Sequence, residues 1–364
     1  ISPDFPVPIS KNEARELLRS FQLGLSEVKN EHQNKEFNLV NKSATSRNTL
    51  NIRQNVEQLD YSEERSQSLE FDDTSLPILS SWIKSNVQLK PHQNIGIAWL
   101  QHLWFRQDIG VRGALLADDM GLGKTLQLLG FIAWYLENSI HIQPVLVVAP
   151  VSLLENWQDE IIKFFDNRLN ENVLALYGKS LKERKVNLRS LDEDLIDIHV
   201  KGFLRPDWLG NHKLVLTTYE TLRDLEFSFA SVKWSIMICD EAQKIKTPGA
   251  LMTHAAKAQN AQFKIACTGT PVENSLADLW CLFDFIQPGL LKSLSEFCRL
   301  YRKPIESKTD EDDTKLDELR KIIEPQVLRR MKYEVADLPE KVIDDHSKSL
   351  ILTNYQHHLY EQAT

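Results

Sequence analysis

Residues 118–125 read Asp-Asp-Met-Gly-Leu-Gly-Lys-Thr and directly follow the apolar run Gly113–Ala117. A strand that ends in a glycine-containing loop and continues as Lys-Thr and a helix is typical of a polyphosphate site. The glycines let backbone N–H groups approach the phosphates, Lys124 supplies a positive charge, and Thr125 offers a hydroxyl to magnesium. The generic phosphate loop has glycine where this chain has Asp118, so the octet alone leaves open an ordinary glycine turn that caps a helix.

A second chemical signal is the acidic pair Asp240-Glu241, which follows the apolar run Ile236–Cys239. Phosphoryl transfer to water requires a metal ion near the phosphates and a group that orients or deprotonates the water. Asp240 suits the metal role and Glu241 the role of base. The alternative is an acidic helix start, since carboxylates favour helix N-termini. The Lys-Thr pair after another predicted strand favours the catalytic interpretation.

The elements that must position these residues begin at about residue 86, where short apolar runs alternate with helical patterns. Near-continuous apolar strands between helices predict an α/β fold with a doubly wound, mainly parallel sheet covered by helices on both faces. Ligands are then expected at the carboxyl ends of the strands. The predicted strands are Gly113–Ala117, Val145–Ala149, Lys213–Thr218, Ser235–Cys239 and Phe263–Cys267. The predicted helices are Thr125–Glu137, Leu153–Phe165, Ala250–Ala258 and Leu276–Phe285.

The flanking and inserted segments are more polar. Residues 1–85 form a predicted polar extension of unknown role, with a helical pattern at Lys11–Leu25. Lys179–Leu209 is interpreted as a surface excursion. Beyond about residue 290 the pattern becomes helical and charged, with a solvated acidic loop predicted at Asp310–Asp313 and a helix at Leu316–Met331.

Composition limits the possible functions. The 364 residues are 42% hydrophobic, which is enough for a sizeable core, and carry a net charge of −8. Nucleic-acid binding would therefore need a local basic groove, or would depend on phosphate contacts made by other parts of the protein, rather than on bulk positive charge. Cys239 and Cys267 lie inside apolar runs and are interpreted as buried thiols; no Cys-x-x-Cys pair supports a zinc site or disulfide framework. No apolar stretch approaches the roughly 18 residues of a membrane span, and no signal peptide is recognisable, so a cytoplasmic location is expected.

Three segments resemble the nucleotide-site motifs of Swi/Snf-like ATPases, which belong to helicase superfamily two. They are the octet 118–125, Asp240-Glu241-Ala242-Gln243, and Thr268-Gly269-Thr270-Pro271-Val272-Glu273-Asn274. Asp118 is usual in that family, whereas Asp119 replaces a commoner Glu, and Gln243 resembles bacterial members. Further segments in the same order extend the resemblance over about 88–345: Leu89–Gln93 with Trp99-Leu100, Ala149–Trp157, Thr217–Glu220, Leu328–Lys332 and Leu338–Lys341.

The resemblance implies ATP and magnesium as cofactors and assigns roles to individual residues. Gln93 would recognise adenine, while Thr125 and Asp240 would hold magnesium. The catalytic residues would be Lys124, Asp240, Glu241 and Gln243. Nucleotide contacts are expected along the whole loop, at Asp118, Met120, Gly121, Leu122, Gly123, Lys124, Thr125 and Leu126. Coupling of the nucleotide state to lobe movement would involve Gln243, Thr268, Gly269 and Thr270.

The resemblance also implies contacts to a nucleic-acid backbone at Pro150, Ser152, Asn156, Thr217 and Thr218. Short neutral donors contact phosphates without reading sequence. Alternatives stay open, because Ser152-x-x-Glu155 also fits a helix capping box and Thr217-Thr218 also fits a strand end. Trp157 is interpreted as a core residue rather than a base-stacking platform. Four basic residues are interpreted either as phosphate contacts or as solvated charges: Lys244, Lys246, Arg302 and Lys303.

The family architecture implies a RecA-like ATP-binding lobe at 86–290, a helical insertion and interlobe connector at 291–345, and the start of a truncated second lobe at 346–364. With a second RecA-like lobe absent, the chain is expected to be a fragment that hydrolyses ATP slowly. The implied function is an ATP-dependent double-stranded DNA translocase motor, in a nucleoid-associated protein if it is bacterial. Its partners would be duplex DNA, the missing lobe and further proteins. The alternatives are a non-catalytic DNA- or nucleotide-binding scaffold and an RNA-directed ATPase of the same superfamily.

Overall fold

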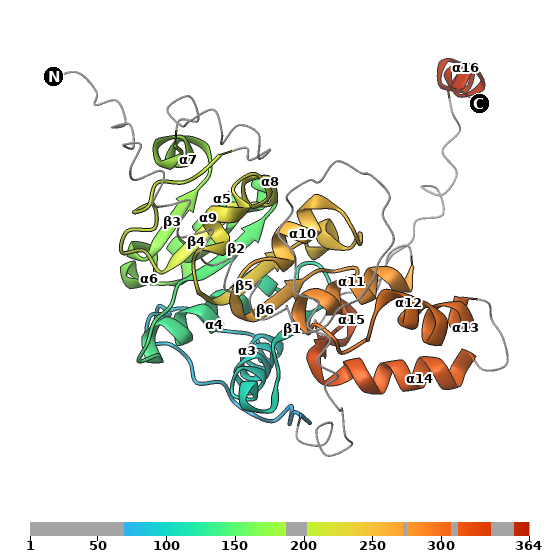
Figure 1. Ribbon diagram of the computed structural model, residues 1–364, viewed down its shortest axis with the longest axis horizontal. Coiled ribbons are helices and arrows are strands. Elements are labelled where there is room, and N and C mark those ends of the chain that lie inside the picture. The colour runs from blue at the N-terminus through green and yellow to red at the C-terminus, as the bar shows by residue number, and fades with distance from the viewer. Residues whose placement is uncertain (1–68, 187–201, 272–274, 307–311, 336–352, 364) are drawn as a thin grey trace, which may run out of the picture.

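The computed structural model describes residues 69–186, 202–271, 275–306, 312–335 and 353–363. The helix predicted at Lys11–Leu25 lies outside these ranges. Within them, the chain forms one seven-stranded sheet with helices on both sides (Figure 1). The strand order is β3-β4-β2-β5-β6-β1-β7, and every neighbouring pair is parallel. This confirms the predicted doubly wound α/β fold.

The strands are short and largely apolar, as expected for a sheet buried on both faces. Every residue of β2, β4 and β5 is buried. The bounds are β1 Gly113–Leu116, β2 Val145–Ala149, β3 Val173–Leu176, β4 Leu214–Thr218, β5 Trp234–Asp240, β6 Ala261–Cys267 and β7 Val327–Leu328. All five predicted strands are confirmed to within two residues at each end.

Two apolar clusters cover the two faces of the sheet. Successive strand residues divide between them: Leu116 belongs to the first cluster and Leu115 to the second. This alternation follows from side chains that point to opposite faces along a strand. The first cluster contains residues of α3 Pro91–Trp104, α4 Lys124–Asn138 and α5 Val151–Phe164. The second contains residues of α8 Tyr219–Asp224, α9 Glu226–Ala230, α10 Leu251–Lys257 and α11 Leu276–Ile286.

Shorter elements complete the described chain. They are η1 Gln107–Ile109, α6 Asn167–Glu171, α7 Gly178–Arg184, η4 Ala242–Ile245, α12 Leu294–Phe297, a π-helix at Cys298–Arg302, α13 Lys303–Glu306, α14 Asp312–Ile323, η6 Glu324–Gln326, α15 Lys332–Val335 and α16 Asn354–Ala363. The helical character predicted beyond residue 290 is confirmed for α12–α14. The acidic loop predicted at Asp310–Asp313 is wrong for its second half, because Asp312 and Asp313 begin α14, and its first half lies outside the described residues.

The helix predicted at Leu316–Met331 is wrong in its second half. α14 ends at Ile323, and the chain then forms a 3-10 turn and β7. Pro325 explains the end of the helix, because proline lacks an N–H and clashes with the preceding turn. Gln326 then fixes the next strand: its side-chain amide donates to the carbonyl of Gly113 at 2.8 Å, so β7 adds to the edge of β1.

The packed body also begins earlier than the predicted boundary at residue 86. Leu69 is 4% exposed and belongs to the first apolar cluster, and Trp82 and Ile83 pack against that cluster. Ile83 forms an antiparallel bridge with Phe165 at the end of α5. The described part of the polar extension is therefore attached to the sheet.

Candidate nucleotide and nucleic-acid site

The strand register brings the predicted chemical residues to one edge of the sheet. Cys267, the last residue of β6, is the register partner of Leu116 in β1 and of Asp240 in β5. The phosphate-loop segment after β1, the acidic pair and Thr268 therefore begin at the same level. The buried thiol of Cys267 reflects this arrangement: burial raises its pKa well above the usual value, and Asp240, Lys124 and Glu241 all act on it electrostatically.

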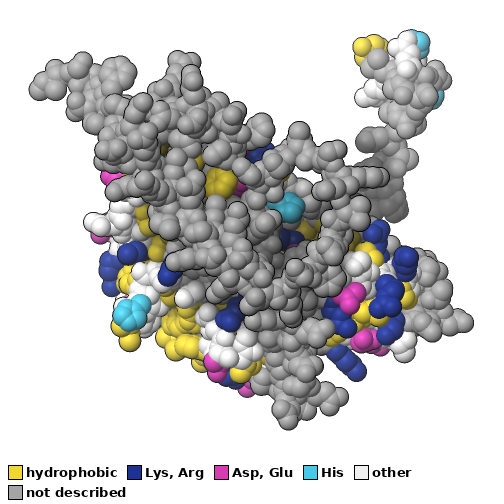
Figure 2. All heavy atoms as spheres, in the orientation of Figure 1, with side chains coloured by type: hydrophobic (Ala, Val, Ile, Leu, Met, Phe, Trp, Pro, Cys, Tyr) yellow, Lys and Arg dark blue, Asp and Glu magenta, His cyan; other side chains and the backbone are white. Residues whose placement is uncertain are grey.

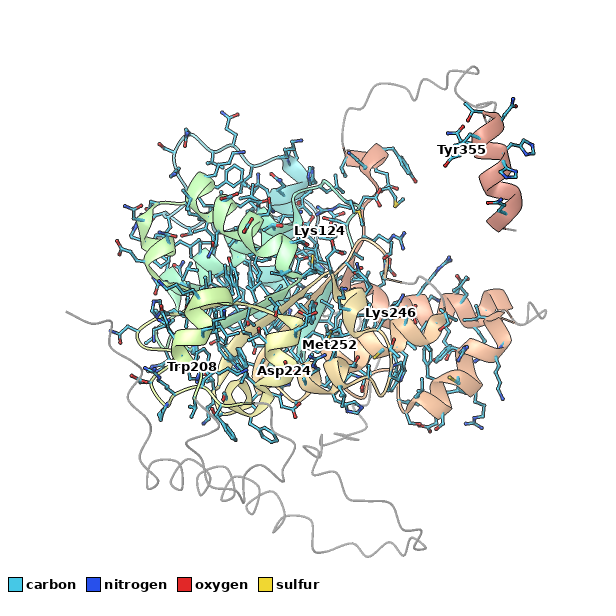
Figure 3. The ribbon with its side chains drawn as sticks, turned by 90° about the horizontal axis from the view of Figure 1, so that it is seen from above. Lys124, Trp208, Asp224, Lys246, Met252 and Tyr355 are labelled. Carbon is cyan, nitrogen blue, oxygen red and sulfur yellow. The ribbon has the colours of Figure 1, made fainter. Side chains whose placement is uncertain are left out.

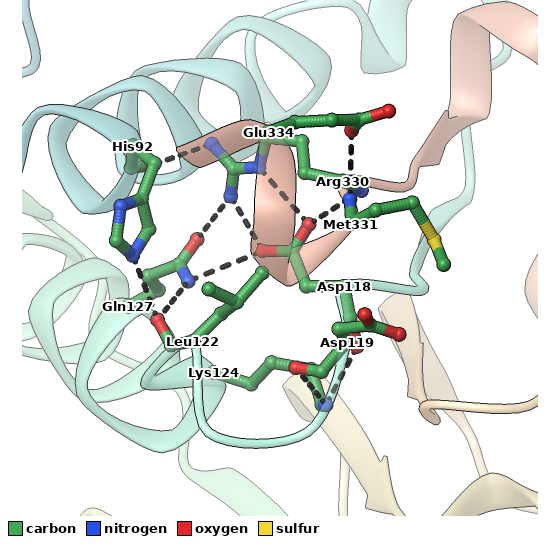
Figure 4. A network of polar contacts seen from close by, with 9 residues as sticks. All are labelled: His92, Asp118, Asp119, Leu122, Lys124, Gln127, Arg330, Met331 and Glu334. Atoms are coloured by element: carbon green, nitrogen blue, oxygen red, sulfur yellow. Dashed lines mark hydrogen bonds and ion pairs between the residues drawn. The ribbon is translucent and has the colours of Figure 1, made fainter. Parts of the chain in front are cut away.

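The phosphate loop depends on two glycines in the left-handed region. Gly121 has φ 86° and Gly123 has φ 74°, and Gly123 is the N-cap of α4. The Lys124 amine donates to the carbonyls of Asp118 at 2.7 Å and Asp119 at 3.2 Å, so its charge lies over the loop (Figures 3 and 4). The start of a helix and a lysine at one place form an anion site.

Other loop side chains differ in exposure. Met120 is 62% exposed, whereas Leu122 and Leu126 are buried. The two leucines therefore hold the loop against the core. Nucleotide contacts at Leu122 and Leu126 stay predictions, and burial of the side chains limits them to the backbone.

Gln93, the predicted adenine-recognition residue, lies against this loop. It is 7% exposed, and its side-chain oxygen accepts from the backbone N–H of Lys90 at 2.9 Å. A Cβ atom built on Gly123 would lie 2.4 Å from the Gln93 amide nitrogen. The structure thus places Gln93 of α3 beside the start of α4, and adenine recognition stays a prediction.

Asp118 forms a buried ion pair that sequence reasoning missed (Figure 4). The Arg330 guanidinium donates to both carboxylate oxygens, from Nε at 3.0 Å and from a terminal nitrogen at 2.5 Å. Arg330 also donates to the Gln127 side-chain oxygen at 3.0 Å and to the carbonyl of His92. The Asp118 side chain is 0% exposed, so its carboxylate is satisfied inside the protein. A nucleotide contact at Asp118 stays a prediction. Because the side chain is bonded to Arg330, such a contact would be made by the Asp118 backbone.

The segment that contains Arg330, from Leu328 to Lys332, runs alongside the backbone of the phosphate loop. Ala117 N–H donates to the carbonyl of Leu328 at 2.7 Å, and Asp119 N–H donates to that of Arg330 at 3.0 Å. Lys332 N–H then donates to the Asp119 carboxylate at 3.0 Å. The segment that the resemblance assigns to the interlobe connector is therefore docked onto the phosphate loop. The signal in the sequence was an aspartate at the end of a buried strand, which requires a cation nearby.

Asp240 is held from three directions. One carboxylate oxygen accepts from the Trp157 indole at 2.8 Å and the other from the backbone N–H of Glu241 at 3.0 Å. Its carbonyl accepts from the Tyr219 hydroxyl at 2.7 Å. Burial raises the pKa of Asp240, and the Trp157 hydrogen bond opposes that shift. Carboxylate and hydroxyl oxygens suit Mg²⁺, so the donor set of Asp240 and Thr125 fits this ion.

The residues predicted to couple the nucleotide state to movement form one chain of hydrogen bonds. The Gln243 amide donates to the Glu241 carboxylate at 2.7 Å, and the Thr268 hydroxyl donates to the Gln243 oxygen at 2.8 Å. Thr270 N–H donates to the Thr268 hydroxyl at 3.1 Å. The predicted base is thus connected to the turn after β6. A Cβ atom on Gly269 would lie 3.2 Å from the Met120 side chain, which brings this turn beside the phosphate loop.

The residues assigned to nucleic acid lie after β2 and at the end of β4. Ser152 and Asn156 are exposed on α5, and the Asn156 amide donates to Glu160 at 3.1 Å. The capping-box interpretation of Ser152 is wrong. Pro150 is the N-cap of α5, and Ser152 is the second residue of the helix. Trp157 is fully buried, which confirms its interpretation as a core residue.

The two threonines make local hydrogen bonds. Thr217 is 0% exposed and its hydroxyl donates to the carbonyl of Leu176 at 3.0 Å. The Thr218 hydroxyl accepts from Thr221 N–H at 3.0 Å and so caps α8. These hydrogen bonds agree with the strand-end and capping alternative. Phosphate contacts at Thr217 and Thr218 stay predictions.

The four basic residues fall in two places. Lys244 is exposed in η4, and Lys246 is 3.8 Å from Asp278. Arg302 and Lys303 lie where the π-helix meets α13, and Figure 2 shows Lys and Arg side chains gathered over α12–α14 with Asp and Glu beside them. Phosphate contacts by these residues stay predictions.

Comparison with known proteins agrees with this geometry. A family model described as SNF2-related domain matches residues 92–364. The chain is 50% identical over 317 residues to the Zorya protein ZorD of Escherichia coli O139:H28, a match that covers 87% of this chain and 29% of that protein. It is 36% identical over 251 residues to the chromatin-remodeling ATPase INO80 of Arabidopsis thaliana, with 68% of this chain and 16% of that protein covered.

A solved structure shares both fold and sequence. The Sulfolobus solfataricus SWI2/SNF2 ATPase core in complex with dsDNA matches with a TM-score of 0.55 and 33% identity, over 72% of this chain and 47% of that one. The chain therefore spans less than a third of the length of ZorD and about half of the solved core. Among the described residues, no helix has the length and hydropathy to cross a membrane.

Proposed function

Because the chain belongs to the SNF2-related family of ATPases, we propose that it is the nucleotide-binding part of an ATP-driven motor that moves along double-stranded DNA. The observation that carries the proposal is the common level of three strand ends, which gathers Lys124, Asp240 and Glu241 at one edge of the sheet. The exposed Ser152 and Asn156 on α5 support a phosphate contact near the same edge.

The residues of this edge have distinct proposed tasks. The N-terminal amides of α4 and the Lys124 amine bind the nucleotide phosphates. Thr125 and Asp240 hold Mg²⁺, which when bound neutralises charge on the phosphates. Glu241 accepts a proton from the attacking water at a carboxylate oxygen. Gln243 orients the Glu241 carboxylate through the 2.7 Å hydrogen bond. Thr268 extends that bond to the turn after β6, so a change at the nucleotide can alter the turn.

DNA movement requires partners beyond this site. We propose that a second RecA-like lobe closes on ATP and opens after hydrolysis, which would move the protein along the DNA backbone. Further protein partners and a cytoplasmic or nucleoid location belong to the same proposal. A scaffold without catalysis is disfavoured, because the Glu241–Gln243–Thr268 chain is intact.

The nucleic-acid specificity is tested by ATP turnover of the natural protein that carries this chain. Duplex DNA, single-stranded DNA and duplex RNA are added in turn at fixed salt, since phosphate contacts are salt-dependent. We expect duplex DNA to give the largest stimulation. Equal or greater stimulation by duplex RNA would replace the DNA assignment with an RNA-directed ATPase, and no turnover with any of the three would support a scaffold.

Removing the charge of Glu241 tests the reaction itself. Glu241→Gln keeps the shape of the side chain but removes its basicity, so we expect DNA-stimulated turnover to fall by about 10²–10⁴-fold. ATP affinity, measured by calorimetry, is expected to stay within about threefold because binding and chemistry are separate steps. Glu171→Gln, at an exposed position of α6, is the matched control. Turnover unchanged in Glu241→Gln would remove Glu241 from the role of base.

A further inference from the structure

Two buried hydrogen bonds connect Asp240 to α5, which carries Ser152 and Asn156, and to the first residue of α8, which directly follows Thr218 of β4. The Trp157 indole donates to the Asp240 carboxylate at 2.8 Å, and the Tyr219 hydroxyl donates to the Asp240 carbonyl at 2.7 Å. Trp157 lies on α5 together with Ser152 and Asn156. Tyr219 is the first residue of α8. Asp240 is thus bonded to both segments.

Each connecting residue is enclosed by the protein. Trp157 is 0% exposed and Tyr219 is 1% exposed. Buried side chains pack in fixed rotamers at high density, so a shift of the helix moves the polar atom with it. On α5 the exposed Asn156 directly precedes Trp157, so one turn of helix has a solvent side and a side bonded to Asp240.

The two bonds fix different parts of the acidic pair. The indole N–H restrains the rotation of the Asp240 carboxylate. The tyrosine hydroxyl holds the backbone at the end of β5, directly before Glu241, whose φ of 52° lies in the left-handed region. A displacement of either helix would therefore change the position of the metal carboxylate, of the base, or of both.

We propose that Trp157 and Tyr219 are positioning residues through which DNA binding on α5 and at the end of β4 sets the geometry of Asp240 and Glu241. The proposal rests on the proposed function, because it specifies how DNA stimulates ATP hydrolysis at this site. Neither residue is assigned a contact with ATP or with DNA. Their effect is exerted through Asp240.

The test removes each polar atom and keeps an aromatic side chain, although the ring becomes smaller in the tryptophan variant. Trp157→Phe deletes the indole N–H, and Tyr219→Phe deletes the hydroxyl. The chain offers matched controls: Trp234, 0% exposed, donates its N–H to the carbonyl of Phe229 at 2.9 Å, and Tyr135, 3% exposed, donates to that of Gln143 at 3.3 Å. Trp234→Phe and Tyr135→Phe are therefore equally conservative but leave Asp240 untouched.

The readout is coupling rather than activity alone. The dissociation constant for duplex DNA is measured on the natural protein with and without Mg²⁺ and a non-hydrolysable ATP analogue. Coupling between two sites is reciprocal, so the ratio of these constants reports the link directly. We expect the ratio and the DNA-stimulation factor to fall by about tenfold in Trp157→Phe and Tyr219→Phe, the size expected for one buried hydrogen bond. DNA affinity without nucleotide should match the controls.

The outcomes separate the inference from the proposed function. If the unmodified protein shows no DNA stimulation, the proposed function fails. If it is stimulated, and Trp157→Phe and Tyr219→Phe keep the coupling ratio of Trp234→Phe and Tyr135→Phe, the inference is overturned. An equal loss of coupling in all four variants also overturns it, because the loss would then reflect a loosened core.

Discussion

At the scale of single residues, Gly123 combines two constraints at the start of α4. Its φ of 74° lies in the left-handed region, and an added Cβ atom would lie 2.4 Å from the Gln93 amide nitrogen. Gly123→Ala is therefore expected to cost about 1–2 kcal/mol in the free energy of unfolding from backbone strain. It should also displace Gln93 and the loop, and weaken ATP binding by at least about tenfold. Calorimetric titration of ATP and chemical unfolding measure the two effects.

Gly249 provides a control that distinguishes backbone strain from the contact with Gln93. It has φ 81°, similar to Gly123, but nothing lies within 4 Å of an added Cβ atom. Gly249→Ala should show the same loss of unfolding free energy with unchanged ATP affinity. If both variants bind ATP like the unmodified protein, the contact between Gly123 and Gln93 has no part in the site.

The chemical residues of the site were predictable because they follow apolar strands. Asp240 ends β5, Thr268 directly follows β6, and Lys124 follows the loop after β1; a parallel sheet brings these strand ends to one edge. Their hydrogen-bond partners were not predictable. Trp157 reads as an ordinary core residue, and its burial alone does not indicate that the indole N–H reaches Asp240. Such a bond depends on the packing of α5 against the sheet, which sequence periodicity does not specify.

At the scale of elements, the segment after α14 packs against the phosphate loop and is hydrogen-bonded to it. Arg330 bonds both oxygens of the fully buried Asp118 carboxylate, and the backbone beside it pairs with the loop. Removing one partner of a buried pair leaves an uncompensated charge. We expect Arg330→Gln to lower the unfolding free energy by about 3–5 kcal/mol and to weaken ATP binding, as measured by urea unfolding and calorimetry.

The adjacent Arg329 provides the comparison for this prediction. Arg329 is exposed, so Arg329→Gln should change the unfolding free energy by less than about 0.5 kcal/mol. Similar unfolding curves for the two variants would show that the Asp118 pair does not stabilise the connector.

The sequence predicted the central strands better than the edge of the sheet. Leu319, Ile323 and Val327 recur at four-residue spacing, which favours one continuous helix. Pro325 interrupts that helix, and the hydrogen bonds of Gln326 to distant residues decide that the following residues form β7. These partners lie on β1 and after α11, so local periodicity alone did not indicate the strand.

At the scale of the whole molecule, charge and size both limit what these 364 residues do alone. The net charge is −8, so long-range electrostatics do not attract DNA, and binding depends on local contacts such as those proposed for α5. The chain matches 47% of the solved SWI2/SNF2 core. If a second lobe supplies an arginine that stabilises the charge on the transferred phosphate, the site described here lacks a group worth about 10³–10⁵ in rate.

If the natural protein also carries a second RecA-like lobe, we expect residues 1–364, purified alone, to bind ATP but to hydrolyse it at least about 10³-fold more slowly than the whole protein. Binding survives because the left-handed glycines, Lys124 and Gln93 belong to one packed unit with α3 and α4. Hydrolysis should not survive, because the role proposed for Glu241 also requires that the charge on the phosphates be neutralised from the opposite side. Calorimetry and phosphate release measure the two quantities on one preparation. Brisk, DNA-stimulated phosphate release by residues 1–364 would show that this edge of the sheet is a complete catalytic site.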